Sequence, residues 1–425
     1  MDFGKRDLLR NLGAGGLAAL TGIAPTDGRA DSKQRGATRR GPTTVDFSSI
    51  SDRQRDPLHV REHFPIVQHT IFLNTAYIAP SPISVVLAGR AFLERKAKRP
   101  LDIEVLLRKE DEVRAQFASL IRADLDEIGI LYATSEGENA IVAGLDLQKG
   151  DNVVIDELHY ETTFLLYRSL ERLRGIEPRI VAHRSGAVDV NDFAPHIDGR
   201  TRLVSVALVS NLNGFRHEMR PIADLAHAHG ALFYTDAMQA VGMIDIDVHA
   251  MGIDFLCCGG YKWLFAGFGV APLFVRRELL EGVRLDRFGD FQIKKALPEH
   301  QYELVDTAQK FEFASRAYGE IFQLNAALTF LQAIGIPKIE SHSVALAHRL
   351  HSGLVAQGHR MFTPPQNRSS IVAFFSDKPE AEVSRAFEEA HIAVTVRDGA
   401  VRIAPALFNN TDDIDQCLEV TKHLI

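Results

Sequence analysis

Lys262 is the residue whose position in the sequence most strongly suggests chemistry. It stands in Cys257-Cys258-Gly259-Gly260-Tyr261-Lys262-Trp263-Leu264-Phe265, within an apolar run, residues 251–275, whose only other charged residue is Asp254. An unpaired ammonium group is costly to bury, and a lowered pKa relieves that cost, which makes the amine a nucleophile toward carbonyl carbons. A lysine that extends to the surface from a buried strand is the alternative, and Lys262 alone does not exclude it.

Asp236 and Gln239 add a carboxylate and an amide to the same part of the chain. Asp236 lies 26 residues before Lys262 and follows the apolar segment Ala231–Tyr234. This predicts a carboxylate at the carboxyl edge of a parallel strand, where open α/β sheets bind ligands. The carboxylate could pair with a protonated ring nitrogen, and the amide could hydrogen-bond a phenolic oxygen. A helix N-cap explains Asp236 alone equally well.

Two further segments suggest an anion cradle and a stacking partner at the same sheet edge. Thr134–Asn139, with the sequence Thr-Ser-Glu-Gly-Glu-Asn, falls between a predicted strand and a predicted helix. Its hydroxyls and free backbone N–H groups would suit a phosphate. Ser135 and Glu138 also match a capping box, which explains the segment without any ligand. His159 follows another predicted strand and could stack on a planar ring, although a loop histidine is more often simply exposed.

Composition excludes several other classes of protein. A chain of 425 residues with 46% hydrophobic and 24% charged residues suits a globular protein of two or three domains. A net charge of −7 argues against nucleic acid as a partner. The three cysteines give neither a disulfide framework nor a metal site. Charges, glycines and Pro272 interrupt residues 251–275, so we expect no membrane span in the mature protein.

The first thirty residues resemble a twin-arginine export signal. Gly4-Lys5-Arg6-Asp7-Leu8-Leu9-Arg10 precedes a weakly apolar stretch that ends in Gly28-Arg29-Ala30, with Lys5 in place of the first arginine. This predicts a signal peptide over residues 1–30, transport by the Tat translocase and a periplasmic protein. A disordered extension that is never cleaved is the alternative. Residues 31–62 are polar and predict a linker.

From Phe64 onward, short apolar runs alternate with segments of helical period, which is typical of a mainly parallel sheet. In a large domain, residues 63–310, the expected strands are Ile128–Tyr132, Asn152–Asp156, Leu203–Val209, Ala231–Tyr234, Phe255–Cys258 and Val270–Val275, with a crossover helix at Pro221–His229. In a smaller domain, residues 311–425, we expect helices at Tyr318–Ile334, at His342–Gln357 and from Thr411, and strands at Ser370–Phe375, Ile392–Val396 and Val401–Ala404.

Taken together, these residues resemble the class V aminotransferase superfamily, fold-type I pyridoxal-phosphate enzymes that include cysteine desulfurases, kynureninase and isopenicillin N epimerase-like proteins. The likeness runs from about Phe72 to the end of the chain. Its ordered motifs are Phe72-Leu73-Asn74-Thr75-Ala76, Thr134–Asn139, His159, Ser210-Asn211, Asp236-x-x-Gln239, Tyr261-Lys262-Trp263-Leu264, Val401-Arg402-Ile403 and Asn410-Thr411. The resemblance implies pyridoxal 5′-phosphate as cofactor and an α/β fold. It also implies a large domain with a mainly parallel seven-stranded sheet, whose N-terminal segment packs on a smaller C-terminal α/β domain.

The resemblance also implies a role for each cofactor-site residue. Lys262 would hold the cofactor as a Schiff base and move the substrate proton, while Asp236 would pair with the pyridinium. Gln239 would meet the phenolic oxygen and His159 would stack on the ring. The phosphate would be held by Thr134, Ser135 and Tyr261.

Three substrate-site residues and one dimer contact follow from the same likeness. Arg402 matches the arginine that binds the α-carboxylate of the substrate, a bidentate task suited to guanidinium. A surface ion pair is the alternative role for Arg402. Asn74 and Asn211 would also face the substrate. Ser315 matches a segment that reaches the phosphate of the neighbouring subunit, which implies a homodimer.

The departures from the family pattern bear on the reaction. Desulfurases carry serine and histidine where this chain has Gly259 and Tyr261, and they need a cysteine shortly before the carboxylate-binding arginine. No cysteine lies between Cys258 and Cys417. The sequence therefore predicts an exported aminotransferase acting on an amino acid or a peptide-borne amine. A carbon–sulfur lyase or an epimerase is the alternative, and a cysteine desulfurase is disfavoured.

Two other classes of function fit the sequence less well. Gly13-Ala14-Gly15-Gly16-Leu17-Ala18 suggests a nicotinamide-dependent dehydrogenase, but no strand precedes these glycines and no acidic residue follows at the expected position. A catalytically silent scaffold on the same fold would be expected to lack Lys262 or Asp236, and both are present.

Overall fold

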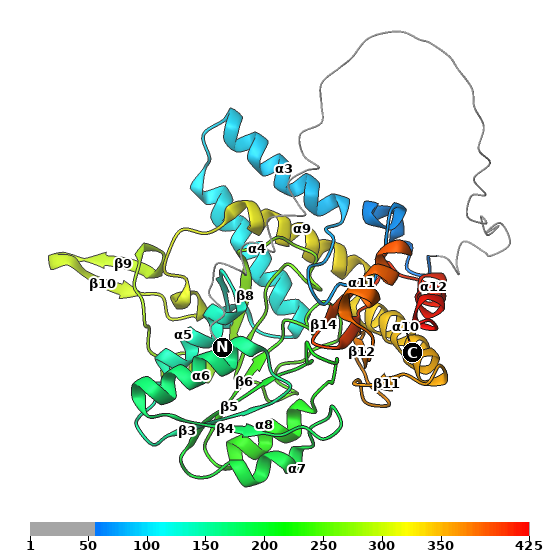
Figure 1. Ribbon diagram of the computed structural model, residues 1–425. Coiled ribbons are helices and arrows are strands. Elements are labelled where there is room, and N and C mark those ends of the chain that lie inside the picture. Colours follow the sequence, from blue (N-terminus) through cyan, green and yellow to red (C-terminus); the bar gives the residue numbers. More distant parts are fainter. Residues whose placement is uncertain (1–55, 425) are drawn as a thin grey trace. The chain divides into compact units, whose positions relative to one another are not determined.

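Figure 1 shows the computed structural model, in which residues 56–424 are described. A seven-stranded sheet with the order β2-β8-β7-β6-β5-β3-β4 forms its largest element. Every neighbouring pair is parallel except those of β8, which runs antiparallel to β2 and to β7. The mainly parallel seven-stranded sheet expected from the sequence is confirmed. Its strands are β2 (Ile128–Leu131), β3 (Asn152–Asp156), β4 (Glu177–Val181), β5 (Thr201–Ala207), β6 (Leu232–Asp236), β7 (Phe255–Cys257) and β8 (Ala271–Val275).

Helices cover both faces of this sheet, which explains its nearly continuous apolar strands. They include α5 (Thr134–Gly144), α6 (Glu161–Arg174), α7 (Val190–Phe193) and α8 (Met219–Ala228). Gly137 lets α5 approach β7 closely, because a Cβ atom at this position would lie 2.6 Å from the Sγ atom of Cys257. The first turn of α5 is thereby held at the carboxyl end of the sheet.

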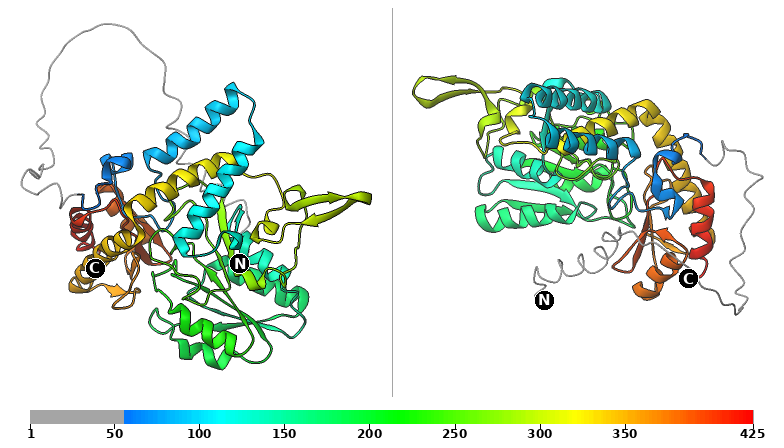
Figure 2. Two further views of the ribbon diagram at one scale, coloured as in Figure 1. Left: turned by 180° about the vertical axis from the view of Figure 1, so that it is seen from behind. Right: turned by 90° about the horizontal axis from the view of Figure 1, so that it is seen from above.

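Three longer helices pack on one another beside the sheet, as the two views of Figure 2 show. They are α3 (Ile83–Lys98), α4 (Ile103–Ile121) and α9 (Tyr318–Ile334), and α9 packs against both of the others. A two-stranded hairpin, β9 (Ile293–Leu297) with β10 (Gln301–Leu304), projects away from the sheet. This hairpin was not predicted, and its strands are exposed almost throughout.

The C-terminal part contains a separate antiparallel sheet with the order β11-β12-β15-β14. Its strands are β11 (Arg360–Met361), β12 (Val372–Phe375), β14 (Thr395–Arg397) and β15 (Ala400–Ile403), and its helices are α10 (Ile336–Ala356), α11 (Glu380–Glu389) and α12 (Thr411–Thr421). The single strand expected at Ile392–Val396 is two, β13 (Ile392–Ala393) and β14. Strand β1 (Ile71–Phe72) pairs with β13, so an N-terminal segment does lie on this part. The two-domain boundary stays a prediction.

Among the described residues, packing against the rest of the protein begins earlier than Phe64. Val60 is 2% exposed, and the Arg61 guanidinium donates to the Asp413 carboxylate at 2.8 Å and to the Phe408 carbonyl at 2.7 Å. The end of the predicted linker is therefore packed against the C-terminal part. The predicted signal peptide, residues 1–30, and residues 31–55 lie outside the described residues. Among the helices of residues 56–424, none has the length and apolar character needed to span a membrane.

A buried ionic network fixes the segment that follows the β9–β10 hairpin. The Glu312 carboxylate accepts hydrogen bonds from Arg114 on α4, at 3.2 and 2.7 Å, and from the backbone N–H of Ile130 at 2.7 Å. Arg316 pairs with the same carboxylate. Glu312 is 2% and Arg114 3% exposed, so this network has little contact with water. One carboxylate thus joins α4, β2 and residues 311–316.

We expect Glu312→Leu to lower the free energy of unfolding by about 3–5 kcal/mol, because two buried guanidinium groups lose their shared partner. Urea unfolding followed by circular dichroism measures the change. Asp415→Ala is the matched control, since it breaks the exposed pair between Asp415 and Arg349, whose side chains are 48% and 49% exposed. The control should change stability by less than about 1 kcal/mol. Equal losses in the two variants would contradict the importance of the buried network.

Candidate active site

A cavity of about 260 Å³ opens at the carboxyl ends of the parallel strands. Because β2, β3, β5, β6 and β7 all run in one direction, the segments that follow them meet at one edge of the sheet. Eight of the residues that line the cavity are Thr134, Ser135, Tyr160, Asn211, Asp236, Gln239, Tyr261 and Lys262. The structure therefore brings together residues that are up to 128 positions apart in the sequence.

Lys262 lies in the turn after β7 and is 9% exposed. Burial and the nearby charge of Arg402 lower the pKa of its amine to about 8, and Asp236 acts in the opposite direction. The Nζ atom lies 6.0 Å from the ring centroid of Tyr160 and 5.9 Å from that of Tyr261. The neutral amine, which a nucleophile or general base requires, is therefore far more abundant near neutral pH than in an exposed lysine.

Asp236 ends β6, and Gln239 lies in the turn that follows. The Asp236 carboxylate accepts a hydrogen bond from the backbone N–H of Met238 at 2.8 Å, and burial raises its pKa. The neighbouring His159 ring, the Met238 hydrogen bond and the charge of Lys262 act in the opposite direction. The Gln239 amide donates to the Ala76 carbonyl at 2.9 Å and accepts from the Trp263 indole at 2.7 Å. Its second N–H remains available to a ligand.

The first turn of α5 offers an anion site. The helix begins at Thr134 after Ala133, whose side chain cannot cap it, and the Ser135 hydroxyl lies 3.4 Å from that of Thr162. The capping box between Ser135 and Glu138 is absent, because Glu138 accepts hydrogen bonds from other hydroxyls. The first N–H groups of the helix have no carbonyl partner one turn back, so they can receive a phosphate.

Sequence reasoning missed the role of Glu138, which holds a buried polar cluster behind the cavity. Its carboxylate accepts hydrogen bonds from the hydroxyls of Thr163 at 2.8 Å, Tyr167 at 3.0 Å and Ser205 at 2.7 Å. The Ser205 oxygen lies 3.3 Å from Nε2 of His159. Because these groups come from α5, α6 and β5, they were too far apart in the sequence to be connected.

His159 is 2% exposed and belongs to this cluster. Its Nδ1 atom accepts a hydrogen bond from the backbone N–H of Tyr160 at 2.8 Å, so the ring proton is on Nε2 and points to Ser205. Tyr160 lines the cavity directly, whereas His159 lies next to it and close enough to influence Asp236. Stacking of His159 on the cofactor ring stays a prediction.

Arg402 on β15 is positioned by both parts of the protein. It donates to the Asn211 carbonyl at 2.7 Å and to the Thr395 hydroxyl at 3.2 Å. The Thr395 hydroxyl in turn donates to the Asn74 side chain at 2.7 Å. Burial lowers the pKa of Arg402 to about 10, and the charge of Arg397 adds to this effect.

No carboxylate of residues 56–424 forms an ion pair with Arg402, which disfavours the surface ion pair that the sequence left open. Its Nε atom is buried without a partner among the same residues. The amide nitrogen of Asn74 donates to the Val394 carbonyl at 3.4 Å, so both ends of that side chain have protein partners. Asn74 and Thr395 therefore position Arg402, and sequence reasoning missed Thr395.

Ser315 is exposed and lies outside the residues that line the cavity. Its carbonyl accepts a hydrogen bond from the Tyr132 hydroxyl, and Tyr132 does line the cavity. The buried Glu312 network therefore ends beside the cofactor site. The contact of Ser315 with a neighbouring phosphate, and the homodimer that it implies, stay predictions.

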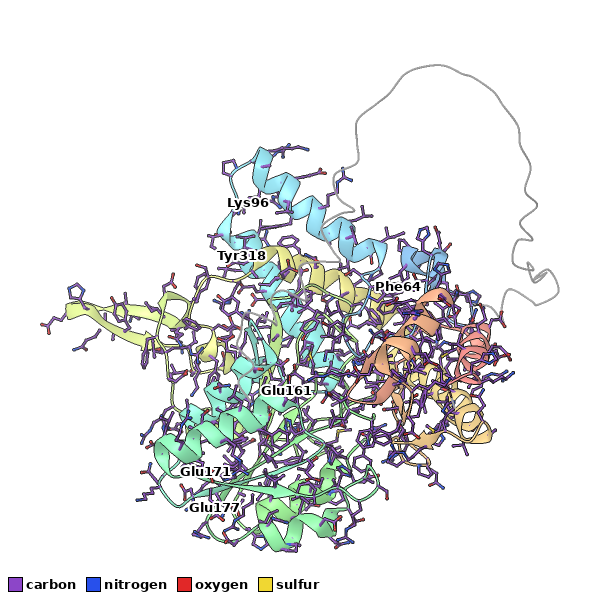
Figure 3. All side chains as sticks on the ribbon, in the orientation of Figure 1. Phe64, Lys96, Glu161, Glu171, Glu177 and Tyr318 are labelled. Carbon is purple, nitrogen blue, oxygen red and sulfur yellow. The ribbon has the colours of Figure 1, made fainter. Side chains whose placement is uncertain are left out.

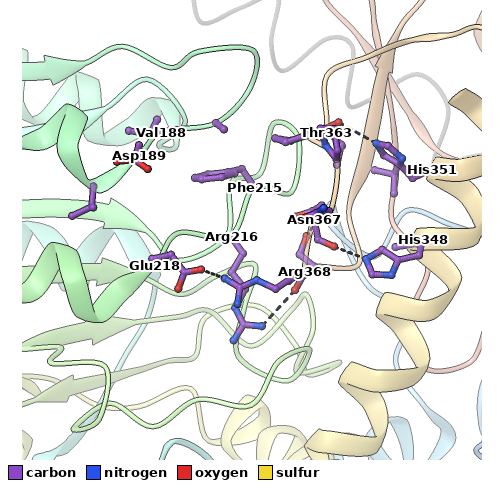
Figure 4. Close-up of a pocket in the computed structure, with 18 of the residues that line it drawn as sticks. Val188, Asp189, Phe215, Arg216, Glu218, His348, His351, Thr363, Asn367 and Arg368 are labelled. Carbon is purple, nitrogen blue, oxygen red and sulfur yellow. Dashed lines mark hydrogen bonds and ion pairs between the residues drawn. The ribbon is translucent and has the colours of Figure 1, made fainter.

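Figure 4 shows a second cavity, of about 970 Å³, which shares no lining residue with the Lys262 cavity. Several of its polar groups have protein partners: Arg368 pairs with Glu218, and His348 and His351 donate to backbone carbonyls at 2.7 and 3.2 Å. Within residues 56–424 there is also no cluster of three or more His, Cys, Asp or Glu that could hold a metal ion. The candidate chemistry therefore lies in the Lys262 cavity.

Residues 94–410 match the family model described as aminotransferase class-V. The chain belongs to this family. It is 28% identical over 380 residues to a probable cysteine desulfurase of Methanothermobacter thermautotrophicus, covering 84% of this chain and 94% of the relative. It is 29% identical over 331 residues to a cysteine desulfurase of Dickeya dadantii, covering 74% and 80%.

Solved structures share the fold of this class V protein. The apo cysteine desulfurase of Thermococcus onnurineus superposes with a TM-score of 0.79 at 24% identity, covering 87% of this chain and 98% of that one. A cystine C-S lyase in complex with its reaction product, cysteine persulfide, gives 0.79 at 19% identity, covering 85% and 99%. At these identities the likeness establishes fold-type I, as the sequence predicted.

The family assigns pyridoxal phosphate as the cofactor of this class V enzyme, and a structural neighbour carries a ligand covalently linked to it. The residues present fit that group. The amine of Lys262, the carboxylate of Asp236 and the first turn of α5 suit its aldehyde, its ring nitrogen and its phosphate. The hydroxyl of Tyr234 and the side-chain oxygen of Asn211 are buried at the cavity without partners among residues 56–424.

The expected reaction requires a correction. Aminotransferase activity was favoured and a cysteine desulfurase disfavoured, but the curated relatives are named cysteine desulfurases. The prediction against a desulfurase relied on the missing cysteine in the loop before Arg402, although the cofactor-site motifs are shared with the superfamily that includes desulfurases. The comparisons carry no support for export either.

The pKa of Lys262 predicts how the enzyme reacts with acylating reagents. In the apoenzyme, competitive labelling by acetic anhydride should rise with pH to a plateau, with a midpoint at about 8, because only the neutral amine reacts. Arg402→Gln should move the midpoint upward, because it removes a positive charge that disfavours the ammonium form. Arg349→Gln, an exposed change on α10, should leave it in place. Mass spectrometry of the Lys262 peptide measures the midpoint, and a value near 10.4 would contradict the prediction.

We expect Thr395→Val to raise KM for an amino acid substrate about tenfold with a smaller change in kcat, because one hydrogen bond that orients the Arg402 guanidinium is lost. Thr395→Ser keeps the hydroxyl and should restore most of the affinity. Steady-state kinetics of both variants measure the difference. If the valine and serine variants bind the substrate equally well, Thr395 does not position Arg402.

Proposed function

We propose that this enzyme cleaves the carbon–sulfur bond of a cysteine-type L-amino acid. The observation that carries the proposal is the Lys262 amine in the cavity with the Arg402 guanidinium next to it, in a chain whose curated relatives are named cysteine desulfurases. Arg402 holds the carbonyl of Asn211, which lines the cavity, and its charge acts on Lys262. An amino acid with a β-sulfur needs a carboxylate anchor and a base at its α-carbon, and these two residues can supply them.

In this proposal the residues of the chain divide the work. Arg402, held by Asn211 and Thr395, binds the α-carboxylate, which orients the substrate relative to Lys262. The Lys262 amine, unprotonated in part because its pKa is about 8, takes the α-proton. The bound cofactor supplies an electron sink for that step, and Asp236 stabilises the protonated ring nitrogen. The phosphate is held by Thr134 and Ser135.

The cysteines of the chain limit where the sulfur goes. Cys257, Cys258 and Cys417 are its only cysteines and are at most 1% exposed. Burial raises all three thiol pKa values, that of Cys417 to about 12. Before Arg402, β14 and β15 are joined by a tight turn at Asp398 and Gly399, which have φ values of 54° and 74°. These buried cysteines therefore do not serve as the acceptor of the sulfur that is released from the substrate.

The test is incubation of the holoenzyme with L-cysteine and L-cystine. We expect release of sulfide, thiol or persulfide together with alanine or pyruvate. Lys262→Ala, reconstituted with cofactor, should lose about 10²–10⁴ in rate, the usual contribution of a general base. An exchange of amino groups with a keto acid, with no sulfur release from either substrate, would contradict the proposal.

A further inference from the structure

Aromatic side chains form one wall of the Lys262 cavity. Tyr160, Tyr261 and Phe268 all line it, and the rings of Tyr261 and Phe268 are stacked with centroids 4.4 Å apart and planes 21° apart. Tyr160 is 38% and Phe268 57% exposed, so the wall extends from the reactive amine to solvent. We call these three residues the aromatic wall.

Tyr160 and Phe268 remain when the other groups around Lys262 are assigned, while Tyr261, whose hydroxyl is predicted to meet the phosphate, presents its ring to Phe268. Asp236, Gln239 and the first turn of α5 suit the cofactor, and Arg402 suits the α-carboxylate. The wall itself carries no charge, because burial raises the pKa of Tyr160 and of Tyr261 and keeps both phenols neutral. A substrate side chain that leaves the Lys262 region along this wall therefore meets neutral, largely apolar surface.

The charged groups near the wall are already paired with one another. Arg397, at the end of β14, lies 3.0 Å from the carboxylate of Asp398 and 3.7 Å from that of Glu161, which is labelled in Figure 3. These side chains are 67–83% exposed and remain in contact with water. They do not call for a charged substituent on the substrate.

The segment that carries Phe268 is closely packed on its inner side. A Cβ atom at Gly267 would lie 1.7 Å from Oε2 of Glu320, so a side chain at this position would require Glu320 to move. The backbone beside Phe268 therefore lies against side chains of α9, while the phenyl ring next to it is more than half exposed. An exposed aromatic ring at the edge of a cavity favours an apolar ligand, because contact removes both surfaces from water.

We propose that the substrate is an S-substituted cysteine whose sulfur carries an apolar or aromatic group, and that the sulfur leaves with this group as a thiol. The inference rests on the proposed carbon–sulfur cleavage. It also accounts for the buried cysteines, because a thiol that departs intact needs no cysteine of the enzyme as acceptor.

The step balances without an oxidant or a reductant. Lys262 takes the α-proton, the Cβ–S bond breaks, and its electron pair leaves with the sulfur. The resulting thiolate takes up one proton from the Lys262 ammonium group. The remaining three-carbon fragment takes up one water and leaves as pyruvate and ammonium.

The test compares L-cysteine, S-methyl-L-cysteine and S-benzyl-L-cysteine as substrates of the holoenzyme, with pyruvate and thiol measured together. We expect kcat/KM for the benzyl compound to exceed that for the methyl compound about tenfold, from contact with the aromatic wall. Phe268→Ala should remove most of this ratio and Phe268→Leu only part of it. Leu173→Ala, an apolar change at an exposed position of α6 outside the cavity, should leave the ratio unchanged.

A binding experiment separates recognition from turnover. Lys262→Ala with cofactor bound should take up S-benzyl-L-cysteine more tightly than S-methyl-L-cysteine in calorimetric titration, and Phe268→Ala in this background should abolish the difference. Equal kcat/KM for the three substrates, or a ratio that Phe268→Ala does not change, overturns the inference but leaves carbon–sulfur cleavage standing. Failure to cleave any of the three and cystine would instead overturn the proposed function.

Discussion

The site depends on the burial of one ammonium group at the edge of an apolar sheet. Water cannot stabilise the charge of Lys262 there, so its protonation is set by the charges of Arg402 and Asp236, which act in opposite directions. Bringing a second cation close would be unfavourable by itself. A carbonyl oxygen and a hydroxyl oxygen hold the Arg402 guanidinium in place. Because neither of them is a carboxylate, the positive charge of Arg402 stays available to a ligand. Burial does most to make Lys262 a base, and the positive charge of Arg402, which adds to that effect, makes the site attractive to a carboxylate.

The parallel sheet supplies the geometry for this arrangement. Its strands end at one edge, so the anion site of α5, the carboxylate of Asp236 and the turn of Lys262 face a common space although the chain between them is long. Gly137 brings α5 against Cys257 of β7, which sets the height of the anion site above the lysine turn. Glu138, one residue later, gathers hydroxyls from α6 and β5 behind the cavity. Helix α5 is thus joined to β7 by the close approach at Gly137, and to α6 and β5 by the hydrogen bonds of Glu138.

Much of this could be predicted from the sequence, because it depends on short motifs and on apolar runs. Strand β3 and helix α9 have the predicted bounds, since each is a continuous pattern with clear ends. Strand β4 was missed because Glu177, Pro178 and Arg179 resemble a loop, yet this edge strand tolerates a proline and faces solvent on one side. Thr395 and Ser205 were missed for a different reason. Thr395 links Arg402 to Asn74, 321 positions away, and Ser205 contacts His159 and Glu138, 46 and 67 positions away. No local pattern marks a hydroxyl for such a role.

Arg402 also lies at a point where the C-terminal sheet is connected to the loop after β5 of the large sheet. Asn211 holds Arg402 from the loop after β5, and two residues further along that loop Asn213 donates to the carbonyl of Phe362 at 3.2 Å and accepts from Thr363 at 2.6 Å. The loop is therefore tied to the C-terminal sheet twice, once at the active site and once behind it. A rotation of that sheet against the large one would act on both ties together. If Arg402 anchors the substrate carboxylate as proposed, selection among substrates falls to the side-chain end of the cavity, where Phe268 is exposed.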